Sequence, residues 1–173
     1  MFINCSELLQ KIMIKSIDQS RILFLDSGPL VRLLQMHPDY YPIVSGVLDG
    51  VYENNVQVLV SSVTLFEICK KAYGANDGVL ARQYREFFEK SANVRLCEVN
   101  ADVSLKAAEL FAAAARTNHK LTEGEAMRLA TAFVNGADCI LTECANFRDA
   151  ADALVVTLDE IWRFLKIVLS LFW

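Results

Sequence analysis

Short apolar runs alternate along the chain with longer segments whose apolar residues recur at helical spacing. Such runs predict strands buried on both faces of a parallel sheet. The expected strands are residues 22–26, 56–60, 94–99, 139–142 and 154–158. The expected helices are residues 6–17, 29–36, 41–53, 62–73, 77–90, 101–117, 122–134 and 159 onward. This alternation predicts an α/β fold, a three-layer sandwich with a central parallel sheet of about five strands and helices on both faces.

The chain is expected to form one domain with an extension at each end. Residues 21–160 contain all the expected strands, and residues 1–20 form an N-terminal extension that is expected to be helical. Residues 161–173 form a C-terminal helix whose apolar side packs on the domain itself, on the N-terminal helix or on a second subunit in a homodimer. Both Met1 and Met13 are candidate start residues.

Composition narrows the classes of protein that the chain can belong to. No apolar run reaches the length of a membrane span, so no membrane partner is expected. The five cysteines are odd in number and contain no CxxC pair, which favours a reducing cytoplasm over a disulfide or zinc framework. The net charge of −4 gives no overall attraction to nucleic acid, so any RNA contact requires a local basic patch.

Asp26 follows the apolar run 22–25 and precedes Ser27-Gly28-Pro29. This places a carboxylate at the carboxyl end of a buried strand, where open α/β sheets bind their ligands. An alternative is that Asp26 caps the next helix by bonding its backbone amides. The position alone does not separate the two interpretations.

Two further carboxylates are expected at the same edge of the sheet. Glu67 lies in the helix after the second strand, and Glu125 lies in the first turn of the helix before the fourth strand. Clustered with Asp26, they would repel one another unless a cation such as Mg²⁺ or Mn²⁺ neutralised them. A metal there could activate a water molecule for attack on a phosphodiester.

Each of these residues also has an interpretation without a ligand. Glu67 precedes Lys70 and Lys71 at the spacing of exposed helical ion pairs, and spacing alone favours that interpretation. Glu125 completes a capping box with Thr122. Other polar residues also have interpretations without a ligand. Thr142 and Glu143 can simply end a strand, and Arg128 and Arg148 can be solvated surface charges.

Four sequence blocks follow one another along roughly residues 21–160: ILFLDSGPLVRLL, VLVSSVTLFEI, KLTEGEAMRLATAFVNGADCILTECANFR and LVVTLDEI. In this order they resemble the PIN domain, and above all the VapC-like toxin ribonucleases. The resemblance implies a PIN-like fold and a cytoplasmic endoribonuclease that hydrolyses RNA phosphodiesters with Mg²⁺ or Mn²⁺. It also implies an antitoxin protein as a partner.

The family's acidic quartet can be carried over by position. It falls on Asp26, with Ser27 in the adjacent small-residue position, on Glu67, on Glu125 where the family has Asp, and on Cys144 where it also has Asp. A thiol is a poor ligand for a hard cation. Residues that could support the site are Thr142, Glu143, next to Cys144 but expected on the opposite face, and Asn146, a weaker oxygen donor.

Two hypotheses about function follow. The first is a metal-dependent endoribonuclease of the toxin type, with RNA held by a basic rim of Lys70, Lys71, Arg128 and Arg148. The second is a degenerate PIN domain that binds RNA or protein with little or no cleavage. An Asp-dependent phosphatase or receiver is set aside, because Gly28 stands where the phosphatases have a second Asp and the acidic pair of receivers is missing.

Overall fold

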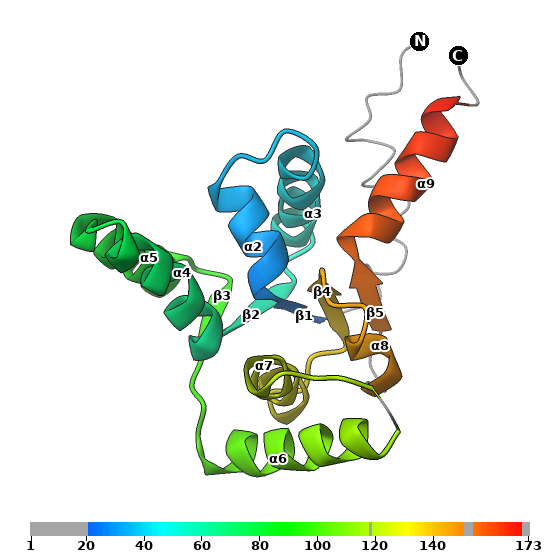
Figure 1. Cartoon of the computed structure of the whole chain (residues 1–173). Coiled ribbons are helices and arrows are strands. Elements are labelled where there is room, and N and C mark those ends of the chain that lie inside the picture. Colours follow the sequence, from blue (N-terminus) through cyan, green and yellow to red (C-terminus); the bar gives the residue numbers. More distant parts are fainter. Residues whose placement is uncertain (1–20, 118, 151–153, 171–173) are drawn as a thin grey trace.

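The computed structural model describes residues 21–117, 119–150 and 154–170, and it shows a five-stranded, wholly parallel sheet (Figure 1). The strand order is β3-β2-β1-β4-β5, and each neighbouring pair is parallel. The strands are β1 (Ile22–Leu25), β2 (Gln57–Ser61), β3 (Val94–Cys97), β4 (Cys139–Thr142) and β5 (Leu154–Thr157). The α/β fold and the parallel sheet predicted from the sequence are confirmed.

Helices cover both faces of the sheet, as predicted. They are α2 (Ser27–Leu34), α3 (Tyr41–Glu53), α4 (Ser62–Gly74), α5 (Gly78–Lys90), α6 (Ala101–Arg116), α7 (Glu123–Val134), α8 (Phe147–Ala150) and α9 (Leu158–Ser170). Figure 1 shows α2, α3 and α9 on one side of the sheet and α6 and α7 on the other. The predicted N-terminal helix lies outside the described residues.

The alternation of side chains along each strand builds two hydrophobic cores. In β1, Leu23 and Leu25 enter the core shared with α2, α3 and α9, whereas Phe24 enters the core shared with α6 and α7. All three side chains are at most 3% exposed. Burial on both faces explains why the strand reads as a continuous apolar run.

The C-terminal helix α9 packs on its own domain. Ile161 and Leu165 are buried in the core beneath α3, and the ring of Trp162 lies 6.2 Å from that of Tyr40. The side chains of Leu169 and Phe172, two further apolar residues of the C-terminal segment, lie outside the described part. No described helix combines the length and the apolar character needed to cross a bilayer.

The boundaries of several elements differ from the predicted ones. α2 begins at Ser27 rather than Pro29, and β3 ends at Cys97 rather than Val99; α4 begins at Ser62 as predicted, with Ser61 as its N-cap. The Ser61 hydroxyl accepts a hydrogen bond from the Val63 amide, which a β-region N-cap residue can do. The short helix α8 was not predicted, because four residues carry too little periodicity to identify a helix.

The strand order fixes where a ligand site can form. The chain adds β2 and β3 on one side of β1, and then β4 and β5 on the other side. The carboxyl ends of β1 and β4 therefore flank the point where the winding changes direction, and open α/β sheets bind ligands at such a crevice.

Candidate functional site

Asp26 lies at the end of β1, and its buried carboxylate is held by two side chains. Its Oδ1 accepts a hydrogen bond from Arg128 Nε at 2.6 Å, and its Oδ2 accepts one from Thr142 Oγ1 at 2.6 Å. Asp26 is only 2% exposed and, although it occupies the N-cap position of α2, its side chain accepts no capping hydrogen bond. The structure therefore decides against the capping interpretation of this residue.

Glu67 reaches the same guanidinium from α4. Arg128 Nη1 donates to Glu67 Oε1 while Nε donates to Asp26, so one arginine bridges the two carboxylates. The interpretation of Glu67 as a partner of Lys70 or Lys71 was wrong, as was that of Arg128 as a solvated charge. Arg128 is 7% exposed, because its position on α7 directs it toward the sheet rather than toward solvent.

Glu125 forms the capping box that the sequence predicted. Its Oε2 accepts from the amide and the hydroxyl of Thr122, and its Oε1 accepts from Cys144 Sγ at 3.3 Å. Burial acts to raise the pKa of Glu125, but these hydrogen bonds and the nearby Arg128 leave that pKa below its ordinary value. Burial, together with the hydrogen bond to Glu125, raises the pKa of the Cys144 thiol to about 12. At neutral pH Cys144 is therefore a neutral donor beside Glu125.

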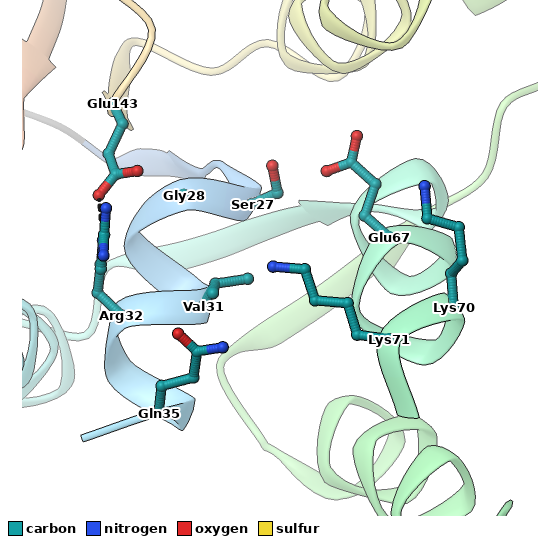
Figure 2. A pocket seen from close by; sticks show the side chains of 9 residues that line it. All are labelled: Ser27, Gly28, Val31, Arg32, Gln35, Glu67, Lys70, Lys71 and Glu143. Atoms are coloured by element: carbon teal, nitrogen blue, oxygen red, sulfur yellow. Dashed lines mark hydrogen bonds and ion pairs between the residues drawn. The ribbon is translucent and has the colours of Figure 1, made fainter. Parts of the chain in front are cut away.

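Glu143 points away from this cluster, as expected of a strand neighbour of Cys144. Its Oε1 accepts a hydrogen bond from Arg32 Nε at 2.7 Å on the side of α2 (Figure 2). The side chain packs over Gly28, where an added Cβ would lie 2.8 Å from Glu143 Cγ. Glu143 therefore does not substitute for the carboxylate that the PIN pattern has at Cys144.

A pocket of about 350 Å³ opens between α2 and α4 beside Glu67. Figure 2 shows the Lys71 side chain extending from α4 toward Val31 on α2, with Ser27 and Glu67 above it in the view. Lys70 lies nearby, with its Nζ 5.4 Å from the centre of the Phe66 ring. The other lining residues are Gly28, Val31, Arg32, Gln35 and Glu143.

The remaining predicted residues lie apart from this pocket or have local partners. Thr142 holds Asp26 and also accepts a hydrogen bond from the Cys144 amide, so it supports the site. Arg148 is bound to Glu160 and to the Val155 carbonyl. The side-chain amide of Asn146 donates to the Lys120 carbonyl oxygen.

The predicted basic rim is corrected accordingly. Arg128 is buried and paired with Asp26 and Glu67, so it does not belong to an exposed rim. The guanidinium of Arg148 is engaged with Glu160, so its charge is already neutralised. Lys70 and Lys71 remain, both exposed.

Solved structures with this architecture include toxin–antitoxin complexes, although no family model and no curated protein sequence matches the chain. A chain of VapBC2 from Rickettsia felis, solved with a DNA fragment from their promoter, superposes with a TM-score of 0.63 at 16% identity, covering 79% of this chain and 98% of that one. FitAcB from Neisseria gonorrhoeae gives 0.60 at 18% identity, covering 79% and 97%. A toxin–antitoxin complex from Klebsiella pneumoniae gives 0.56 at 18% identity, covering 79% and 97%.

The chain has the PIN-domain fold. At these identities the likeness concerns the fold alone, and activity has to be argued from the side chains. The PIN fold accounts for the convergence of Asp26, Glu67 and Glu125, which come from three elements and meet around Arg128.

The side chains as arranged do not fit the Mg²⁺ or Mn²⁺ that the sequence led us to expect. Of the six carboxylate oxygens of Asp26, Glu67 and Glu125, five accept a hydrogen bond from another group of the chain. Within the described ranges, no group of three or more His, Cys, Asp or Glu side chains is placed to hold a metal ion. Metal binding by these residues therefore remains a prediction. The positive group that lies between the Asp26 and Glu67 carboxylates is the Arg128 guanidinium.

Arg128 is the residue whose role the sequence analysis missed. It follows Glu125 by three positions, so the two side chains lie on the same face of α7. That spacing was a usable signal, because the face that brings Glu125 to the edge of the sheet must also bring Arg128 there.

Proposed function

We propose that this chain is a toxin-type PIN protein that binds RNA at the pocket between α2 and α4 and hydrolyses it slowly or not at all. The observation that carries the proposal is the charge of that pocket. Of the two carboxylates that line it, Glu143 is paired with Arg32, and Glu67 shares Arg128 with Asp26. Lys70 and Lys71 form no ion pair with any described residue, so their two positive charges outweigh the one negative charge left by Asp26, Glu67 and Arg128.

Two unneutralised lysines suit the phosphates of a single strand of RNA. Phosphate contacts supply the sequence-independent part of nucleic-acid affinity, and they make it depend on salt. The net charge of −4 gives the surface as a whole no attraction for RNA, so binding depends on a local group of cations such as these lysines. Slow or absent hydrolysis follows from the carboxylates, which are engaged by Arg128, Thr122, Thr142 and Cys144.

Fluorescence anisotropy with a labelled single-stranded RNA tests the proposal across a range of salt concentrations. For Lys70→Ala/Lys71→Ala we expect weaker binding and a salt slope shallower by about 1.4, because each phosphate contact on a single strand contributes roughly 0.7. Arg82→Ala/Arg116→Ala is the matched control, since it removes two exposed cations elsewhere. An equal loss of slope in both double variants would mean that the pocket is not the RNA site.

The second candidate is the metal-dependent endoribonuclease. It is favoured by one observation, the meeting of three carboxylates at the ligand edge of a PIN fold. The same RNA samples, incubated with EDTA or with Mn²⁺ and separated on a denaturing gel, distinguish the two candidates. Cleavage that requires Mn²⁺ and is lost in Glu67→Gln would replace the first proposal with the second.

A partner antitoxin and a cytoplasmic location belong to the same proposal. The support is the set of solved neighbours, which include VapBC, FitAB and a toxin–antitoxin complex, two of them bound to a DNA fragment. Co-expression with the adjacent open reading frame, followed by purification of the tagged chain, would test for a stable complex. A homodimer stays a prediction that the mass of the purified chain in solution would check.

A further inference from the structure

Arg128 serves as a counter-ion supplied by the protein itself. Its side chain is 9% exposed, that of Asp26 is 3% exposed and that of Glu67 is 29% exposed. A charge buried to this degree is tolerated only when it is paired and hydrogen-bonded. Asp26 follows β1, Glu67 lies on α4 and Arg128 lies on α7, so this one cation connects three elements.

We infer that Arg128 takes the place of a divalent cation in this PIN fold, so that Arg128 and a metal ion exclude each other at Asp26 and Glu67. The inference concerns the carboxylates alone and does not depend on RNA binding. It reverses the reasoning from the sequence, in which three clustered carboxylates require a metal. A positive charge does lie beside Asp26 and Glu67, but it belongs to a side chain of α7 and not to a bound metal ion.

The hydrogen bonds of Asp26 are the first argument. Arg128 occupies its Oδ1 and Thr142 occupies its Oδ2, so a metal ion would have to displace at least one of these donors. Thr142 Oγ1 also accepts from the Cys144 amide, which directs its hydroxyl hydrogen to Asp26. Both donors are thus fixed by the surrounding structure before any ligand arrives.

The persistence of the arginine charge is the second argument. A guanidinium is not deprotonated in proteins, so Arg128 cannot make room for a metal ion by losing its charge. A second cation beside it would meet strong repulsion in a poorly hydrated site. Metal binding therefore requires the whole side chain to leave a position in which it is packed and doubly paired.

The inference predicts that the stability of the fold does not depend on a bound metal ion. EDTA should leave the melting temperature of the wild-type chain unchanged, because Arg128 already pairs with both Asp26 and Glu67. Mn²⁺ at millimolar concentration should not raise it. A wild-type chain that loses stability in EDTA and regains it with Mn²⁺ would overturn the inference.

Variants at Arg128 give the sharper test. Free Mn²⁺, measured by its electron paramagnetic resonance signal, is titrated with wild-type, Arg128→Gln and Arg128→Lys chains in the absence of RNA. We expect Arg128→Gln to bind Mn²⁺ at least about tenfold more tightly than wild type, because it removes a juxtaposed like charge. Arg128→Lys keeps the charge and should bind no better than wild type, and Arg148→Gln, which removes an exposed arginine, should behave in the same way.

Each outcome of these titrations either supports or overturns the inference that Arg128 and a metal ion exclude each other. Equal Mn²⁺ affinity in wild type and Arg128→Gln would overturn the inference, and so would tight binding by Arg128→Lys. Should Arg128→Gln be unfolded alone, its folding is followed by circular dichroism during the Mn²⁺ titration. Refolding supports the inference, and a chain that stays unfolded at millimolar Mn²⁺ overturns it. RNA is absent throughout, so a failure here leaves the proposed RNA contact to be judged by its own experiment.

Discussion

Replacing Arg128 by methionine should destabilise the fold far more than removing an exposed arginine. The substitution leaves Asp26, whose side chain is 3% exposed, with Thr142 as its remaining side-chain donor. Breaking a buried ion pair by removing one partner costs about 3–5 kcal/mol. For a chain of this size, each kcal/mol lowers the melting temperature by roughly 2–4 °C, so we expect a decrease of about 6–20 °C.

The same pair offers a way to separate the cost of a lost contact from the cost of a stranded charge. Asp26→Leu/Arg128→Met removes both buried charges and leaves Glu67, which is 29% exposed, to be hydrated. Replacing a buried pair with apolar side chains is often neutral, so the double variant should lie within about 2 kcal/mol of wild type, the remainder reflecting the Thr142 hydroxyl that loses its acceptor. The double variant should therefore be more stable than Arg128→Met alone.

Urea unfolding followed by circular dichroism measures all four members of this cycle. Arg148→Met is the matched control, because its pair with Glu160 is exposed and should contribute less than about 1 kcal/mol. Independent sites add within roughly 0.5 kcal/mol. If the costs of Asp26→Leu and Arg128→Met add to that degree, the two charges do not depend on each other, and the reasoning about the buried pair is refuted.

Two further predictions concern titratable groups outside this pair. The hydrogen bond from Arg148 lowers the pKa of Glu160 to about 2, so the stabilisation by this carboxylate is present above pH 4.5 and disappears as the pH falls toward 2. The difference in melting temperature between wild type and Glu160→Gln should therefore shrink over that range. A difference that stays constant would argue against this prediction. Burial raises the pKa of Cys144 to about 12, so iodoacetamide at pH 8 should label this thiol much more slowly in the folded chain than in urea. Mass spectrometry of the peptide that contains Cys144 measures the two rates. Equal rates would contradict the burial of the thiol.

The sheet could be predicted from the sequence because its evidence is local. The run 22–25 is apolar at every position, and the structure places it in the centre of the sheet with both faces covered. The capping box of Thr122 and Glu125 is equally local and is confirmed. The partner of Glu67 could not be found in the same way, because Arg128 lies 61 positions further along the chain, whereas the competing lysines lie three and four positions away.

The carboxylate cluster shows why residue types alone do not identify a metal site. Three acidic side chains at the ligand edge of a PIN fold require a neutralising charge, and that requirement was correctly derived from the sequence. It does not specify where the charge comes from. Three positions after Glu125, α7 supplies an arginine that reaches the strand end and the neighbouring helix at once. The inference that this cluster binds no metal therefore depends on Arg128, three positions after the third carboxylate, as much as on the carboxylates themselves.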